Sequence, residues 1–261
     1  MVDLRRAVLA TAALVYLTVL LGVSTKAAGA GLACNARWPL CDGGLLDLFP
    51  ATVPSAFEWL HRVVAGVTGL AILGTVALAW REGASRGVRY ATTAGLVLTP
   101  VQVYLGRETV LEFTSPVLAA HYWVAMGIFG SFAVAAALVS RDRLGPRAAR
   151  RALALAALLV PLQVALSPLV VDAYSPPVQA GHYAVTLAVF AAAVVAAVAR
   201  PGRRVVRYGV WTGLAGLPVL VAVGRQVLAD PGLAVVYEAL ALGLFLAFAG
   251  AAVLARADGT T

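Results

Sequence analysis

Long apolar runs alternate with short polar connections along the whole chain. A helix needs about 20 predominantly apolar residues to cross a bilayer, and each run reaches or approaches that length. The third run is the shortest of the series. The pattern predicts an all-α membrane protein whose eight transmembrane helices cover residues 7–24, 62–80, 90–105, 116–139, 152–171, 178–199, 205–224 and 232–255.

The composition excludes an ordinary soluble domain. Hydrophobic residues make up 61% of the chain and charged residues only 12%, and this charged share is about half of that in a typical globular protein. So much apolar surface requires a lipid bilayer around it. The first run is too long, and too poorly followed by a cleavage site, for a typical signal peptide, so we expect it to remain as a helix.

The net charge of +8 would suit nucleic acid, but the positions of the basic residues indicate membrane topology instead. Basic residues concentrate in cytoplasmic loops of membrane proteins. Their distribution here predicts that both termini are cytoplasmic and that no nucleic acid binds. The outer connections contain Lys26, Arg37, Arg62, Arg107 and Arg225. The cytoplasmic set consists of Arg5, Arg6, Arg81, Arg86, Arg89, Arg141, Arg143, Arg147, Arg150, Arg151, Arg200, Arg203, Arg204, Arg207 and Arg256.

The chain also repeats itself. Residues 100–124, PVQVYLGRETVLEFTSPVLAAHYWV, align without a gap with residues 161–185, PLQVALSPLVVDAYSPPVQAGHYAV. A period of roughly 60 residues indicates repeated helical hairpins. Four hairpins fold most simply as two pseudo-symmetric four-helix bundles, here predicted for residues 1–144 and 145–261. Facing helices of such a bundle are a common place to hold a cofactor.

The three histidines occupy equivalent positions at the outer ends of the second, fourth and sixth helices: His61, His121 and His182. A single such histidine is often a packing or hydrogen-bonding residue, but three at matching places favour metal ligation. Imidazole ligates haem iron axially, so His61 and His121 could hold one haem between them. Zinc fits less well, because structural zinc usually takes four Cys or His ligands. In the last hairpin the matching position falls at Tyr237 or Glu238.

Glu58 and Arg62 flank His61 in the stretch FEWLHRVVAGVTG, residues 57–69. Glu58 lies one helical turn before His61 on the same face, and Arg62 lies four residues after Glu58. Two interpretations stay open. The pair is either an ordinary interfacial ion pair, or a carboxylate that handles protons beside a metal-bound substrate, with Arg62 meeting that carboxylate or a haem propionate. The small residues after His61 suit a flat macrocycle and equally suit close helix packing.

Two cysteines, Cys34 and Cys41, lie in the long first outer loop, in the stretch CNARWPLC. The outer face of a membrane is the oxidising one, which favours a disulfide. A reactive thiol pair is the alternative, because the spacing alone does not separate the two.

These features resemble haem A synthase: the loop cysteines, EWLHR opening the second helix, VQVYLGRETV ending the third and AAHYW opening the fourth. The resemblance is specific through the first four helices and covers the rest in topology. It implies an eight-helix oxidoreductase with two haem sites that converts a methyl group of haem O to the formyl group of haem A. It also implies that His61 and His121 ligate the substrate or product haem, that Glu58 is catalytic, and that Cys34 and Cys41 match the family's loop pair.

The C-terminal half departs from the family pattern. The resemblance assigns His182 as one ligand of a haem b cofactor, but the family's second His, on the last helix, is replaced by VVYEAL. Tyr237 could ligate iron, as Tyr does in catalase, and Glu238 could ligate or hydrogen-bond. A five-coordinate haem and the absence of haem are the alternatives. Tyr183 stands where an Arg often follows the helix-six His.

The leading hypothesis is therefore a haem A synthase-like enzyme of the cell membrane, with haem O as substrate and both haem sites toward the outer face. A non-catalytic haem carrier or b-type electron-transfer protein is the alternative. A membrane thiol oxidoreductase that uses Cys34 and Cys41 is disfavoured, because the chain has no further Cys pair. Candidate partners are haem O synthase, terminal oxidase assembly factors and a second copy of the chain.

Overall fold

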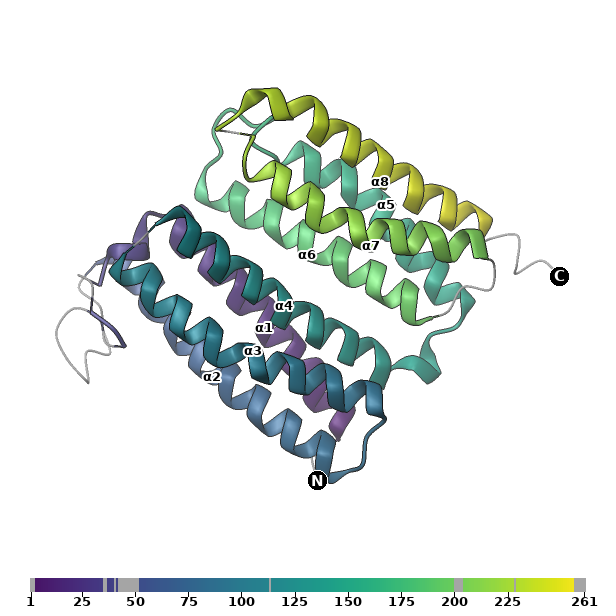
Figure 1. The fold of residues 1–261 in the computed structure, drawn as a ribbon, viewed down its shortest axis with the longest axis horizontal. Coiled ribbons are helices and arrows are strands. Elements are labelled where there is room, and N and C mark those ends of the chain that lie inside the picture. Colours follow the sequence, from purple (N-terminus) through teal and green to yellow (C-terminus); the bar gives the residue numbers. More distant parts are fainter. Residues whose placement is uncertain are drawn as a thin grey trace. The chain divides into compact units, whose positions relative to one another are not determined.

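The computed structural model describes residues 3–34, 37–39, 41, 52–112, 114–199, 204–227 and 229–255, and Figure 1 shows the fold. Three arginines of the predicted cytoplasmic set lie outside the described residues: Arg200, Arg203 and Arg256. Within the described part the chain is all-helical, with three short 3-10 turns. Its eight long helices are α1 (Leu4–Ala27), α2 (Val53–Arg81), α3 (Arg86–Leu111), α4 (Ser115–Val139), α5 (Pro146–Ala165), α6 (Pro176–Val198), α7 (Arg204–Gly224) and α8 (Ala234–Leu254).

Seven of these helices are long and apolar enough to cross a membrane, which confirms a multi-pass membrane protein. The helix that falls short is α3, the one predicted from the shortest apolar run. Charged residues stand near both of its ends, with Arg86 and Arg89 at the start and Arg107 and Glu108 near the close. Because charges at these places reduce the apolar length, hydropathy alone does not establish α3 as an eighth span.

Two helix boundaries differ from the sequence prediction in ways that matter for the site. Helix α2 begins at Val53, well before the predicted residue 62, because Thr52 caps it by accepting a hydrogen bond from the Ser55 N–H at 3.2 Å. Helix α5 ends at Ala165 rather than at residue 171. Pro168 stands three residues later, and proline disfavours a helical conformation in the residue before it, here Ser167. The early start of α2 places Glu58 and His61 inside a regular helix.

The chain divides into two compact units, the N-terminal unit Met1–Val139 and the C-terminal unit Ser140–Thr261. In the N-terminal unit, α1 packs against α2 and α4, and α3 packs against the same two helices. In the C-terminal unit, α5 packs against α6 and α8, and α7 packs against the same two helices (Figure 1). Each unit is thus a four-helix bundle in which every helix has two neighbours.

Threonine hydroxyls set the register between α1 and α2. Thr11 bonds to Thr75 and Thr18 bonds to Thr68, each with 2.8 Å between the two hydroxyl oxygens. One further step of seven residues along α1, Thr25 donates to the Phe57 carbonyl at 3.3 Å. Helices in lipid gain little from hydrophobic burial, so such polar contacts help to define their pairing. The last contact lies beside Glu58.

In the C-terminal unit, close approach of α7 and α8 depends on glycine. A Cβ added to Gly213 would collide with the ring of Phe248, which is completely buried. A Cβ on Gly216 would stand 2.8 Å from Leu244 Cδ2. These glycines let the large apolar side chains of α8 seat against the backbone of α7, as small residues do at helix contacts in membranes.

Candidate functional site

His61 on α2 and His121 on α4 come together inside the N-terminal unit. The two imidazoles lie close enough for the charge of one to act on the other, and the Thr18 carbonyl of α1 also lies beside His61. Gln102 of α3 places its amide nitrogen 3.2 Å from Nε2 of His121. All four helices of this unit therefore contribute to the surroundings of the histidine pair.

Two glycines make room for the imidazole rings. A Cβ on Gly22 of α1 would stand 3.0 Å from Cε1 of His61, and a Cβ on Gly106 of α3 would stand 3.2 Å from Cε1 of His121. Both distances are shorter than an ordinary van der Waals contact between a Cβ and its neighbours. The backbones of α1 and α3 thus pack directly on the two rings and fix their orientation.

Several polar atoms at this place are buried without a hydrogen-bond partner among the described residues. They are Nδ1 of His61, Nδ1 of His121 and Oε1 of Gln102. Buried polar atoms are almost always paired, so a group of unpaired atoms at one spot indicates that a ligand belongs there. The donor set fits haem, because the porphyrin supplies the equatorial ligands and imidazole supplies the axial ones.

Glu58 is the buried carboxylate among the described residues of this unit, with only 6% of its surface exposed. Nε of Arg62 donates to Oε1 of Glu58 at 2.8 Å, so the ion pair anticipated from their spacing is present. Glu58 precedes His61 by one helical turn, which brings the carboxylate and the imidazole to the same face of α2. A buried carboxylate that is paired with an arginine thus lies one helical turn from His61.

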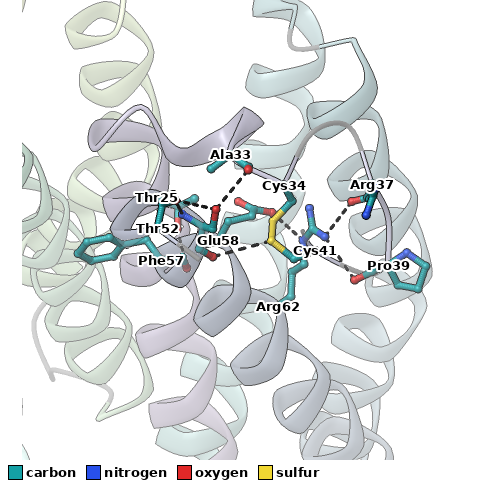
Figure 2. Close-up of a disulfide and its surroundings, with 11 residues drawn as sticks. Thr25, Ala33, Cys34, Arg37, Pro39, Cys41, Thr52, Phe57, Glu58 and Arg62 are labelled. Atoms are coloured by element: carbon teal, nitrogen blue, oxygen red, sulfur yellow. Dashed lines mark hydrogen bonds and ion pairs between the residues drawn. A yellow bond between two sulfur atoms is a disulfide. The ribbon is translucent and has the colours of Figure 1, made fainter. Parts of the chain in front are cut away.

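Described residues of the loop between α1 and α2 contact the first turn of α2. Cys34 and Cys41 form a disulfide, and Figure 2 shows it beside Arg62 and Glu58. The Ser55 hydroxyl donates to the Ala33 carbonyl at 3.3 Å, which joins the start of the loop to the first turn of α2. The cysteine pair is therefore a bridge in this structure, and it lies within the surroundings of the candidate site.

His182 on α6 has both ring nitrogens in contact with side chains of the C-terminal unit. Gln163 of α5 places its amide nitrogen 2.9 Å from Nε2. The hydroxyl of Tyr174 lies 2.6 Å from Nδ1. Burial raises the pKa of the Tyr174 phenol, and the neighbouring Tyr183 and Tyr237 raise it further. Tyr174 is thus a neutral hydroxyl at neutral pH, able to donate to His182.

Tyr237 of α8 points into the same region, whereas Glu238 does not. Tyr237 is 1% exposed, its hydroxyl faces Ser167 and Gln163, and that oxygen has no geometrically satisfactory hydrogen bond among the described residues. Glu238, the next residue, is exposed. The structure therefore brings Tyr237 and His182 toward one polar region and leaves Glu238 outside it.

The ring of Tyr237 packs on glycine in the same way as His61. A Cβ on Gly224, at the end of α7, would stand 2.8 Å from Cε2 of Tyr237. Arg225 follows Gly224 and donates to the Tyr183 hydroxyl at 3.2 Å. An arginine from the end of α7 thus reaches the residue after His182.

Sequence reasoning missed some residues of these sites. The repeat aligned Gln102 with Gln163 and so contained a signal for the two histidine-bonded amides. Gly22 and Tyr174 carried no comparable signal, because their roles depend on contacts between helices or with a loop. Gly106 lies in the repeated segment 100–124, but nothing in that segment indicated that it contacts a histidine ring.

The fold and the site define a helical membrane protein that brings two histidines together inside its N-terminal unit. Consistent with this, the family of cytochrome oxidase assembly proteins matches residues 5–175. The chain belongs to this family, which includes the haem A synthases.

Individual relatives match about half of the chain. Haem A synthases of Bacillus licheniformis and Bacillus pumilus are 30% and 32% identical over 135 and 131 residues, which are 51% and 48% of this chain and 43% and 41% of those proteins. Protohaem IX farnesyltransferase of Halobacterium salinarum is 44% identical over 133 residues, 50% of this chain and 28% of that protein. The matched part thus spans between about a quarter and a half of the length of these relatives.

Proposed function

We propose that the protein oxidises the methyl group of haem O to the formyl group of haem A. The observation that carries this proposal is the buried Glu58 carboxylate beside a histidine pair whose spare ring nitrogens are buried and unpaired. Membership of a family that includes haem A synthases, and the similarity of half of the chain to such enzymes, support it. The similarity to farnesyltransferases that act on protohaem IX is also consistent with a haem substrate.

His61 and His121 would hold the substrate haem through its iron, one from each of two facing helices. Gly22 and Gly106 leave room for the two rings, since a Cβ at either position would press on an imidazole. Gln102 bonds to His121 and limits the orientation of that ring. A ligand fixed in this way presents its periphery in a constant position, which is a requirement for attack at one chosen methyl group.

Glu58 would accept the protons that the substrate loses. When water supplies the oxygen atom and an external acceptor takes the electrons, oxidation of a methyl group to an alcohol and then to an aldehyde releases two electrons and two protons at each stage. A carboxylate in reach of the reacting carbon can accept those protons. Burial keeps bulk water away from Glu58, and Arg62 stabilises its charged form through a charge-assisted hydrogen bond.

The C-terminal unit would hold a haem b cofactor through His182 and Tyr237. His182 has a second partner in Tyr174, which would orient the ring for ligation. Tyr237 takes the position of His121, since each packs on a glycine that precedes an arginine near the end of the preceding helix, and the Tyr237 hydroxyl is buried without a satisfactory partner. This likeness supports the proposed pseudo-symmetry between the units. When bound, haem b would supply one-electron transfer.

The proposed location is the cell membrane, with both termini in the cytoplasm and both sites toward the outer face. The support is the distribution of arginine, which places most basic residues in alternate connections. Haem O synthase, which makes the substrate, is the proposed functional partner, with assembly factors of the terminal oxidase receiving the product. A second copy of the chain remains a candidate partner.

The direct test is the Glu58→Ala variant in cells that supply haem O. We expect haem in the purified protein at the parent level and at least about a hundredfold less haem A, because the carboxylate is needed for chemistry and the histidines for binding. Extracted haems would be separated and quantified by chromatography. An unchanged yield of haem A would remove the assigned role of Glu58. Bound haem without any haem A from the parent would favour the haem carrier.

A further inference from the structure

The guanidinium of Arg62 makes contacts in two directions. Its Nε donates to the Glu58 carboxylate at 2.8 Å. One terminal nitrogen donates to the backbone carbonyl of Arg37 at 2.9 Å and to that of Pro39 at 3.3 Å. Figure 2 shows the side chain between the carboxylate and the loop. Arginine suits such a link because its donors form a rigid, planar fork.

Both carbonyl groups belong to the short segment that the disulfide closes. Arg37 and Pro39 lie between Cys34 and Cys41, which are both buried and bonded to each other. The ends of this segment are also tied to α2, because Ser55 donates to the Ala33 carbonyl and the Ser55 carbonyl lies 4.0 Å from Sγ of Cys41. Reduction of the bridge would remove the covalent link that keeps the two carbonyls facing Arg62.

We infer that the disulfide and Arg62 form a single positioning device for the Glu58 carboxylate. The bridge holds the Arg37 and Pro39 carbonyls, the carbonyls hold the guanidinium, and the guanidinium holds the carboxylate. In this account the cysteines affect turnover through the position of Glu58 and transfer no electrons to the substrate. Arg62 is a positioning residue, and the inference rests on the proposed function of Glu58.

The test is a set of variants that removes each link separately and both together. The variants are Arg62→Gln, the pair Cys34→Ser with Cys41→Ser, and the combination of all three. We expect the first two each to lower the rate of haem A formation by on the order of 10- to 100-fold, as a displaced catalytic group does. The combination should be no slower than the slower of the two, because both changes break one chain of contacts.

Haem content and a matched control separate positioning from misfolding. Bound haem should stay at the parent level in all three variants. Arg107→Gln is the matched control, because Arg107 also pairs with a glutamate, Glu108. Arg107 is exposed and lies outside the disulfide-closed loop, so its replacement should leave turnover unchanged. Arg62→Lys, which keeps the charge but lacks the fork, should recover only part of the activity.

A measurement without turnover gives a second reading. The infrared carboxylate band of Glu58 can be assigned from the difference between the parent and Glu58→Gln. A phosphine reductant should shift that band in the parent and leave it unchanged in Arg62→Gln.

Three results would each overturn the inference. The first is a loss of activity in the combined variant equal to the product of the separate losses, and the second is full activity in the Cys pair variant. The third is a reductant-induced shift of the Glu58 band in Arg62→Gln. If Glu58→Gln itself keeps full turnover, the proposed function of Glu58 fails, whatever the other variants show. If Glu58→Gln is inactive but the losses multiply, only the positioning device fails.

Discussion

At the scale of single residues, the site depends on two glycines as much as on its histidines. Gly22 and Gly106 leave the space in which the rings of His61 and His121 lie. The sequence pattern identified both histidines, because they are rare and recur at equivalent helix ends. It could not identify Gly22, since a hydropathy pattern contains no information on which residue of another helix will face an imidazole.

The close contact of Gly22 makes a testable prediction. Gly22→Ala places a Cβ 3.0 Å from Cε1 of His61, so the ring must turn or α1 must move. We expect about tenfold weaker retention of haem in the N-terminal unit, comparable to the loss of a residue that orients a metal ligand. The measurement is the titration of purified, haem-depleted protein with haem, followed by absorbance.

The control for this prediction lies in α2. Gly74 has open space where a Cβ would be added, so Gly74→Ala should bind haem as the parent does. Equal affinity of Gly22→Ala and the parent would show that contact with this glycine does not orient His61.

At the scale of helices, the hydropathy pattern predicted every long helix, but it did not predict the first turns of α2, which contain Glu58 and His61. The apolar core of α2 was predicted from residue 62, whereas the helix begins at Val53. Hydropathy measures transfer of side chains into lipid, and the first turns of α2 contain polar groups that are satisfied by capping and by the loop instead. The same limitation applies to α5, which ends at Ala165 although apolar residues continue.

The threonine contacts between α1 and α2 lead to a prediction about stability. Thr18→Val removes the hydrogen bond to Thr68 with little change in volume. We expect the free energy of unfolding in detergent to fall by about 0.6 kcal/mol, the usual value for such a bond between membrane helices. Thr99→Val serves as the control, because the Thr99 hydroxyl bonds to the Gly95 carbonyl of its own helix. An equal fall in both variants would argue against the interhelical role.

At the scale of the whole molecule, two bundles of related sequence have different residues at the positions proposed to bind haem. The repeat between α3–α4 and α5–α6 was readable because Gln102, His121, Gln163 and His182 align. The histidine-equivalent position of the last hairpin was readable only in part, since the spacing left Tyr237 and Glu238 as equal candidates. Burial separates them, because Tyr237 faces the interior and Glu238 faces outward.

The proposed C-terminal haem gives a prediction about stoichiometry. Tyr237→Phe keeps the ring on Gly224 and removes the hydroxyl. If the Tyr237 phenol ligates iron, the charge-transfer absorption of the phenolate–iron bond should disappear in the variant. If His182 alone does not retain the haem, bound haem should also fall from about two to about one per chain. Iron and protein would be quantified in the same sample. An unchanged spectrum and ratio would exclude Tyr237 as a ligand.

The central claim is that this protein makes haem A from haem O at the histidine pair of the N-terminal unit. The most direct measurement is to purify the protein from cells that make haem O but lack any other haem A synthase. Its haems are then extracted and identified by the pyridine haemochrome spectrum. The account predicts haem A with the parent, and only haem O and haem b with Glu58→Gln. Protein that contains no haem, or haem O that is never converted by the parent, would contradict it.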